Sequence, residues 1–217
     1  VGAPGAPLDV AALQSYQLAR VNETLALVQE QSRFYRGLLG SAPLHLESLE
    51  QLRTLPFTTA LQVRDDPHGF LCMSPGRVER IVTLPTSGTT GPPKRLFFSA
   101  ADQELTRDFF HHGMSTLVAP GDRVGILLPG SLPGSVGALL EEGLARMEVA
   151  GVVLGPVRYP EETLGQLAGE RCTAIVGIPV QVLELARLNR ALPQYRLAVH
   201  SVLLSTDTEP MRQRPRC

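Results

Sequence analysis

The sequence predicts an α/β protein, in which a helical N-terminal arm precedes a mostly parallel sheet with helices on both faces. Two observations lead to this prediction. Apolar residues recur at steps of three and four between about Asp9 and Leu39, which is the period of an amphipathic helix. From Arg123 onward, short apolar segments alternate with helical segments of about 8–15 residues, the order of a parallel sheet covered by helices.

The arm is expected to span residues 1–56, and the α/β part residues 57–217. Asn22 and Ser32 are the two places where the long helical pattern weakens, so the helix is expected to divide at one of them. In the second part we expect the elements that follow. They are a short helix capped by Thr58 or Thr59 and ending near Asp66, strands at 78–83, 94–98, 123–128, 149–154, 173–176 and 199–204, and helices at 99–117, 135–147, 160–168 and 180–188.

Composition and charge exclude several classes of function. The net charge is −1 and the pI about 6.6, so no basic patch for nucleic acid is indicated. No apolar stretch approaches the roughly 20 residues that span a bilayer, and the first residues lack the pattern of a signal peptide. The three cysteines (Cys72, Cys172 and Cys217) are far apart, which predicts neither a zinc site nor a disulfide framework. A cytoplasmic protein without nucleic-acid or membrane partners is expected.

Residues 86–94 form the segment of the chain with the clearest chemical character. Its glycines permit positive φ and close backbone approach, so that successive amides can surround an anion. Lys94 is the single lysine among the 20 basic residues of the chain. This segment predicts a phosphate-binding loop, whose candidate ligands are Thr86, Ser87, Gly88, Thr89, Thr90, Gly91 and Lys94.

The spacing excludes a P-loop of the GxxxxGK[ST] type. Pro93 stands where the second glycine is required, and Arg95 follows Lys94 in place of Ser or Thr. A P-loop also opens a helix, whereas residues 94–98 read as a strand. The loop is therefore expected to join two strands and to close over phosphates; the competing interpretation is a Ser/Thr/Gly-rich surface turn.

These nine residues match the phosphate-loop signature of the adenylate-forming superfamily, which the chain resembles. Over nearly its whole length the sequence is also similar to the phenylacetate–coenzyme A ligase branch. The segments that carry this similarity are Ser32-Arg33-Phe34-Tyr35, Leu55-Pro56-Phe57-Thr58, Pro120-Gly121-Asp122-Arg123-Val124, Val176-Gly177-Ile178-Pro179 and Leu203-Leu204-Ser205-Thr206-Asp207-Thr208-Glu209-Pro210.

The resemblance implies an ATP-dependent ligase. A carboxylate attacks the α-phosphate of ATP, pyrophosphate leaves, and coenzyme A captures the acyl-adenylate. Lys94 and Thr89 would be catalytic, within the loop that holds the β- and γ-phosphates. ATP, Mg²⁺ and coenzyme A are the implied cofactors and co-substrates, and an aromatic acid is the branch-level expectation for the substrate. The residues implied to border adenine are Ser205, Thr206, Asp207, Glu209 and Pro210.

The sequence departs from the family in two respects. Some members have Lys-Pro-Thr where this chain has Pro92-Pro93-Lys94, so the loop is closer to the wider superfamily. The family's Tyr-Gly-x-x-Glu segment, whose glutamate holds magnesium, and its catalytic lysine of the C-terminal domain are not in these 217 residues. We therefore expect an N-terminal part that is inactive alone. The alternatives are a non-catalytic nucleotide-binding paralogue and a subunit completed by another chain, in a homo-oligomer or otherwise.

A few further residues have a weaker chemical signal. Adjacent histidines in a helix lack the i, i+4 spacing of a metal site, so partly buried helix histidines are expected, with one facing a ligand pocket as the alternative. Three residues after the strand at 173–176 are candidates for the acyl pocket, and two cysteines are expected to be inert in the core. The histidines are His111 and His112. The candidates for the acyl pocket are Pro179, Val180 and Gln181, and the cysteines expected in the core are Cys72 and Cys172.

Overall fold

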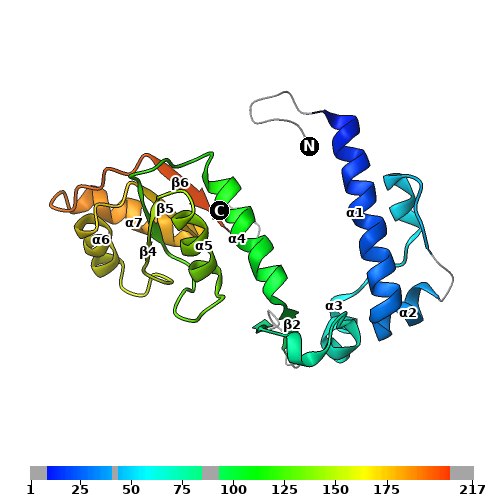
Figure 1. The fold of residues 1–217 in the computed structure, drawn as a ribbon. Helices are drawn as coiled ribbons and strands as arrows, with labels where there is room; N and C mark the ends of the chain where they lie inside the picture. Colours follow the sequence, from blue (N-terminus) through cyan, green and yellow to red (C-terminus); the bar gives the residue numbers. More distant parts are fainter. Residues whose placement is uncertain (1–8, 41–43, 85–92, 206–217) are drawn as a thin grey trace, which may run out of the picture. The chain divides into compact units, whose positions relative to one another are not determined.

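The computed structural model describes residues 9–40, 44–84 and 93–205 of the chain. The chain forms two compact units, Val1–Ala100 and Ala101–Cys217, each of which is described by itself (Figure 1). The limits predicted from the sequence, 1–56 and 57–217, differ from this division. They stay a prediction about domain organisation.

The first unit begins with two helices that meet at Ser32. Helix α1 (Val10–Gln31) is capped by the Asp9 carboxylate, and helix α2 (Arg33–Leu39) by the Ser32 hydroxyl. The Ser32 hydroxyl also donates to the carbonyl oxygen of Gly69 at 2.8 Å. The long helix therefore divides at one of its two predicted weak points, where the hydroxyl of the buried serine accepts from the Tyr35 N–H of α2 and donates to a distant backbone carbonyl.

Asn22, the other predicted weak point, lies inside α1. Its side-chain amide accepts from the Leu46 backbone N–H at 2.8 Å and donates to the Leu46 carbonyl at 2.9 Å. Leu46 is buried against the helix. Because the oxygen and the nitrogen of the Asn22 side chain both bond to a segment 24 residues away, the side chain does not compete with the hydrogen bonds of its own helix.

The rest of the first unit consists of short elements and a hairpin. The Thr59 hydroxyl and the Gln62 side chain form a capping box that starts α3, as predicted from the threonine. Rings of Phe34 and Phe70 stack with centroids 4.0 Å apart, which joins α2 to the segment after α3. The elements are the 3₁₀ helix η1 (Leu49–Thr54), α3 (Ala60–Asp65), η2 (Pro67–Phe70), η3 (Pro75–Arg77), β1 (Arg80–Leu84) and β2 (Lys94–Phe98).

The second unit is a four-stranded parallel sheet in the order β4-β3-β5-β6. Each connection between strands is a helix, as parallel neighbours require. The elements are α4 (Ala100–Met114), β3 (Arg123–Ile126), α5 (Val136–Ala145), β4 (Ala150–Val153), α6 (Pro160–Gly169), β5 (Ala174–Gly177), α7 (Pro179–Ala191) and β6 (Ser201–Leu204).

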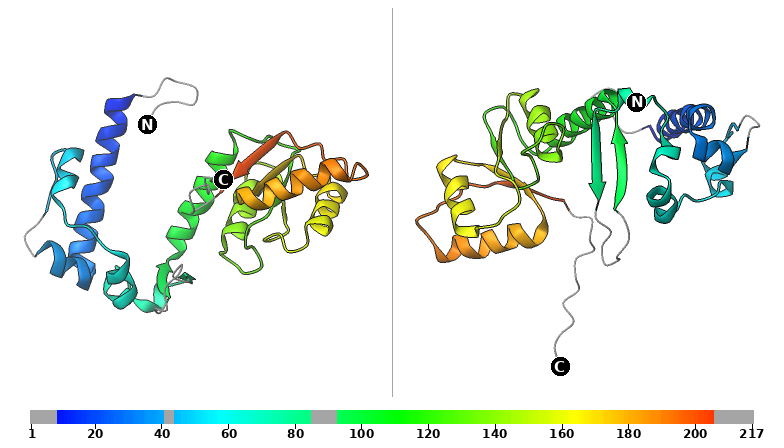
Figure 2. Two further views of the ribbon diagram at one scale, coloured as in Figure 1. Left: turned by 180° about the vertical axis from the view of Figure 1, so that it is seen from behind. Right: turned by 90° about the horizontal axis from the view of Figure 1, so that it is seen from below.

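Helices cover both faces of this sheet, as the two sides of the second unit in Figures 1 and 2 show. Val124 and Ile126 face a buried cluster formed with α4 and α5, whereas Ile175 faces a second cluster formed with α6 and α7. Side chains of a strand alternate between its faces, so strands buried on both sides read as continuous apolar runs. The predicted fold class is confirmed.

Three polar residues connect the amino ends of neighbouring strands. Asp122, Thr173 and His200 stand just before β3, β5 and β6. The Asp122 carboxylate accepts from the Thr173 hydroxyl at 2.7 Å and from the Ala119 N–H at 2.8 Å, and His200 Nε2 lies 2.9 Å from it. These bonds lower the pKa of Asp122 to about 2, the Ala119 N–H being the largest cause. The cluster sets the register of three strands at the edge opposite their carboxyl ends.

Asp122 is expected to make the second unit sensitive to acid. A carboxylate whose pKa is lower in the folded than in the unfolded chain stabilises the fold above its ordinary pKa of 3.8, and this stability is lost as pH falls towards 2. Between about pH 4 and pH 2 the wild type should therefore lose about 1–2 kcal/mol that Asp122→Asn does not lose. Urea titrations at several pH values measure this. Glu184→Gln, an exposed acid of the same unit, should follow the wild type; parallel pH curves for all three proteins would contradict the assignment.

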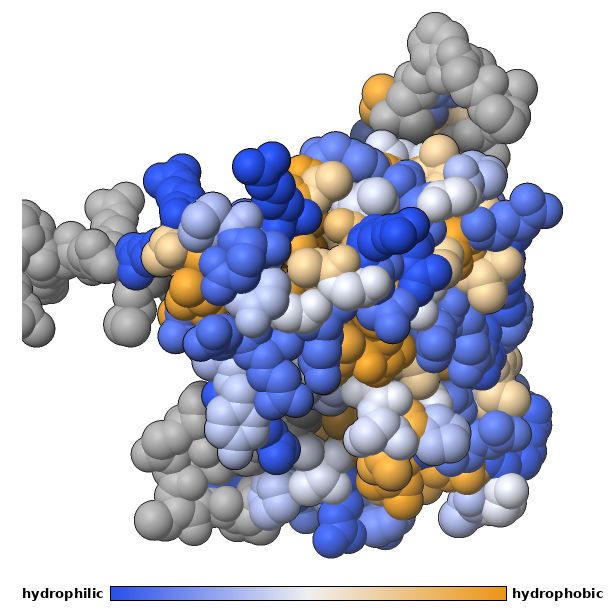
Figure 3. Space-filling view, turned by 90° about the vertical axis from the view of Figure 1, so that its left-hand side faces the viewer, coloured by the Kyte–Doolittle hydropathy of each residue, from blue (hydrophilic) through white to orange (hydrophobic). Residues whose placement is uncertain are grey.

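No helix among the described residues is long and apolar enough to cross a membrane. Exposed apolar side chains occur in both units, and Phe57 is the most exposed of the large ones in the described ranges, at 90%. Figure 3 shows one face of the molecule, on which such residues are scattered among hydrophilic ones. Single exposed apolar side chains of this kind are ordinary for folded proteins.

Candidate functional site

The predicted phosphate loop joins the two strands of an antiparallel hairpin. β1 and β2 pair from Arg80 with Phe98 to Leu84 with Lys94, and residues 85–93 connect the last pair. The strand-to-strand connection predicted from the sequence is therefore confirmed, and the arrangement is not that of a P-loop, which leads into a helix. The loop residues Thr86, Ser87, Gly88, Thr89, Thr90 and Gly91 lie outside the described residues.

Lys94 lies at the loop end of this hairpin. It is the first residue of β2, directly opposite Leu84, and it is half-buried. The next residue, Arg95, is exposed and points to the other face of the strand, because side chains alternate along it. The face of Arg95 also carries Phe97, whose ring lies 5.2 Å from that of His68 in η2. Strand pairing with Leu84 thus fixes the backbone of the lysine next to the loop.

Ser205 marks the predicted adenine segment in the second unit. It follows β6 directly, is exposed, and its N–H donates to the carbonyl oxygen of Gly177 at 2.9 Å. This bond continues the parallel pairing of β5 and β6 by one residue and places Ser205 at the carboxyl edge of the sheet. The other adenine candidates, Thr206, Asp207, Glu209 and Pro210, lie outside the described residues.

The carboxyl edge is the part of such a sheet where ligands bind. The chain proceeds from β3 outward to β4, then returns to place β5 on the other side of β3, so the topology reverses between β3 and β5. A depression of about 610 Å³ lies at this edge, beyond the ends of β3 and β4. Its lining residues are Pro129, Gly130, Ser131, Val153, Leu154, Gly155, Pro156, Arg158, Tyr159, Glu162, Thr163 and Gln166.

Two glycines let helix α5 approach the loop after β3 closely. The Gly137 N–H donates to the Pro129 carbonyl oxygen at 2.8 Å. A Cβ on Gly137 would lie 2.9 Å from that oxygen and 3.0 Å from the Leu128 oxygen, and one on Gly130 would lie 2.2 Å from Val153. The loop that borders the depression is therefore fixed by backbone contact, with no room for side chains between loop and helix.

The three acyl-pocket candidates lie at the start of α7. Pro179 is the first residue of the helix, and Val180 is 68% exposed. The Gln181 side-chain oxygen accepts from the Val157 N–H at 3.3 Å, which connects α7 to the loop after β4. This is a structural contact; the assignment of the three residues to an acyl pocket stays a prediction.

The histidines and cysteines occupy different environments. His111 is half-buried in α4, whereas the His112 side chain is 72% exposed. Cys172 is 1% exposed, in the core as predicted. The same prediction is wrong for Cys72, which is only half-buried, with its sulfur 3.6 Å from the Phe70 carbonyl oxygen. Burial raises the pKa of both thiols, which disfavours the reactive thiolate.

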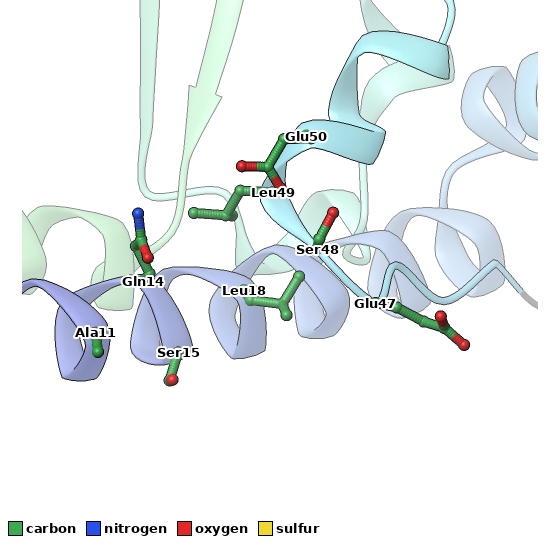
Figure 4. A pocket seen from close by; sticks show the side chains of 8 residues that line it. All are labelled: Ala11, Gln14, Ser15, Leu18, Glu47, Ser48, Leu49 and Glu50. Atoms are coloured by element: carbon green, nitrogen blue, oxygen red, sulfur yellow. The ribbon is translucent and has the colours of Figure 1, made fainter.

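A depression in the first unit offers less to a nucleotide. It lies between α1 and η1 and has a volume of about 270 Å³. Figure 4 shows Leu18 of α1 on one side and Leu49 of η1 on the other. Its charged residues are Glu47 and Glu50, both acidic, and acids repel phosphates. We do not assign this depression to the site.

Sequence reasoning missed the polar lining of the depression at the carboxyl edge. Arg158, Tyr159 and Glu162 follow β4 and start α6, next to Pro156 and Pro160. The prolines indicate a turn, but no spacing in the sequence distinguishes these side chains from a solvated helix start. They become candidates only because the parallel sheet brings the end of β4 beside the end of β3.

No family model and no curated protein matches the sequence. Solved structures of 2-hydroxyisobutyryl-CoA ligase are similar to the chain. The open conformation with 2-HIB-AMP and CoA has a TM-score of 0.77 and 18% identity over 93% of this chain and 49% of the ligase. The thioesterification state has a TM-score of 0.77 and 20% identity over 91% and 44%.

The chain thus spans about half the length of this ligase. At such low identity the similarity shows a shared fold, which is the α/β fold of part of this CoA ligase. The sequence resemblance implied the same fold.

Proposed function

We propose that the chain is the N-terminal, nucleotide-binding part of an ATP-dependent carboxylate–coenzyme A ligase. The observation that supports it best is the segment 86–94, with its hydroxyls, glycines and single lysine, placed as the connection of an antiparallel hairpin. A fold shared with an acyl-CoA ligase, in a chain with this loop, favours nucleotide chemistry over a plain surface turn. The fold alone would not assign the activity.

In this proposal the chain's own residues bind and orient ATP. Backbone amides and hydroxyls of residues 86–91 surround the β- and γ-phosphates, and Lys94 neutralises the charge that develops as pyrophosphate leaves. Ser205 and residues 206–210 border adenine. Mg²⁺, when bound, adds to the neutralisation, and we assign no described residue to it. The acid carboxylate attacks the α-phosphate, the bond to pyrophosphate breaks, and the thiol of coenzyme A later displaces AMP.

The substrate acid is proposed at the level of a class. The sequence resemblance to the phenylacetate branch favours an aromatic acid, and the similar ligase of known structure acts on a short branched hydroxy acid. The proposal therefore names a small carboxylic acid, aromatic acids first, bound at the carboxyl edge where Pro179, Val180 and the depression beyond β3 and β4 lie.

The test is ATP–pyrophosphate exchange with aromatic and short branched acids. It is run on this chain and on the longest natural polypeptide that contains it. We expect acid-dependent exchange from the longer polypeptide, and none from the chain alone, because it spans about half of the similar ligase. Absence of exchange from both, together with measurable ATP binding, would favour the alternative of a non-catalytic nucleotide-binding protein or a subunit completed by another chain.

A further inference from the structure

Helix α4 carries three metal-ligating side chains on one exposed region. Asp108, His111 and His112 each offer one ligand atom, and these atoms all lie within 4.8 Å of one another. Residues three and four apart share a face of a helix, so Asp108 meets both histidines. The adjacent histidines alone lack the i, i+4 spacing of a metal site, and Asp108 supplies the i, i+4 partner of His112.

One of the distances between ligand atoms matches that of a coordinated ion. Zinc binds imidazole nitrogen and carboxylate oxygen at about 2.0–2.2 Å, which in a tetrahedral site separates two ligand atoms by about 3.4 Å. Asp108 Oδ1 and His112 Nε2 are 3.3 Å apart. The rings of His111 and His112 are nearly parallel, with centroids 4.9 Å apart, so His111 has to change its side-chain rotamer to aim a ring nitrogen at the same ion.

The surroundings favour a rigid site without repulsion from cations. The backbone of α4 at Arg107 and His111 packs against Gly143 of α5, where a Cβ would lie 2.9 Å from the Arg107 oxygen. The Arg107 guanidinium pairs with Glu142 and Glu104, so its charge is compensated. The helix holds the backbone of all three ligands on neighbouring turns, so the conformational entropy lost when an ion binds is that of their side chains.

We propose that Asp108, His111 and His112 form a surface site for a divalent transition-metal ion, with Zn²⁺ as the principal ligand. Two imidazoles and one carboxylate suit Zn²⁺, Ni²⁺ or Cu²⁺, whereas Mg²⁺ and Ca²⁺ prefer oxygen ligands. Three protein ligands leave a position for water or for a ligand from another molecule. The site is independent of the proposed ligase activity and of the loop at 86–94.

The test is calorimetric titration of the untagged, chelator-treated full chain with Zn²⁺, and with Mg²⁺ for comparison. Loss of an outer-shell partner costs about 10–100-fold in metal affinity, so His112→Ala, which removes a ligand, should weaken Zn²⁺ binding at least about tenfold. Asp108→Asn is the conservative second variant and should weaken it as well. His45→Ala, an exposed histidine of the first unit, is the matched control and should bind like the wild type.

Spectra of the Co²⁺-loaded chain distinguish this site from the cysteines. The proposal expects nitrogen and oxygen coordination without the intense thiolate charge-transfer band, and loss of this spectrum in His112→Ala. A thiolate band, equal Zn²⁺ affinity in wild type and His112→Ala, or no Zn²⁺ binding at all would overturn it. The last result would leave Asp108 and His112 as an ordinary ion pair of a helix surface.

Discussion

In the longest natural polypeptide that contains this sequence, Lys94→Ala is expected to lower the rate of ATP–pyrophosphate exchange about 10²–10³-fold, the effect of removing one preorganised donor from a developing charge. Lys94 is the first residue of β2, opposite Leu84, so strand pairing fixes its backbone at the point where residues 85–93 rejoin the hairpin. Exchange measured at saturating acid, with ATP varied, gives the loss in turnover separately from the loss in ATP affinity.

Arg95→Ala is the matched control for this variant. It removes one positive charge one residue further along the same strand, from an exposed side chain on the opposite face. We expect exchange close to that of the wild type. Lys94→Arg should fall between the two, since a guanidinium keeps the charge but not the compact shape of the ammonium. Equal losses in Arg95→Ala and Lys94→Ala would refute a specific role for the lysine.

Gly137→Ala is expected to destabilise the second unit by about 1–3 kcal/mol, the usual cost of overpacking. The added methyl would meet three backbone atoms at 2.9–3.0 Å, the oxygens of Pro129 and Leu128 and the Cα of Gly130. Backbone cannot rotate away as the end of a side chain can, so α5 has to move from the loop after β3. Urea unfolding followed by circular dichroism measures the change.

Gly113→Ala is the control, because it adds the same methyl to a glycine in a helix with open space around it. Gly113 lies in the last turn of α4, where the preference for alanine is smaller than the roughly 1 kcal/mol of a helix interior, so this variant should be as stable as the wild type or slightly more stable. Of the two substitutions, only Gly137→Ala is expected to lower the free energy of unfolding. A stable Gly137→Ala protein would show that α5 and the loop are less tightly packed than the contact distances indicate.

Most elements of the fold follow from local patterns in the sequence. The strands near Arg123, Val149 and Thr173 were predictable because a strand covered on both faces is apolar throughout, and glycine and proline mark its ends. The break at Ser32 was one of two candidates, and the sequence alone did not separate them. The choice depends on Gly69 and Leu46, which lie far along the chain and meet Ser32 and Asn22 only in the fold.

The candidate site was predictable to a smaller extent. Residues 86–94 have a local composition that indicates phosphate binding, and strand pairing on both sides agrees with the predicted connection. The Asp122, Thr173 and His200 cluster was not predictable, because its members are up to 78 residues apart and only the parallel register brings them together. The place of Arg158 in the depression was not predictable for the same reason, because only the parallel sheet brings the end of β4 beside the end of β3.

The proposed ligase activity is tested most directly by identifying the nucleotide products that are formed from ATP. The longest natural polypeptide is incubated with ATP, Mg²⁺ and an accepted acid, first without and then with coenzyme A, and the products are separated by mass. The proposed ligase activity predicts pyrophosphate and an acyl-adenylate in the first reaction, then AMP and an acyl-coenzyme A thioester in the second. Formation of ADP and phosphate in place of these products would contradict it.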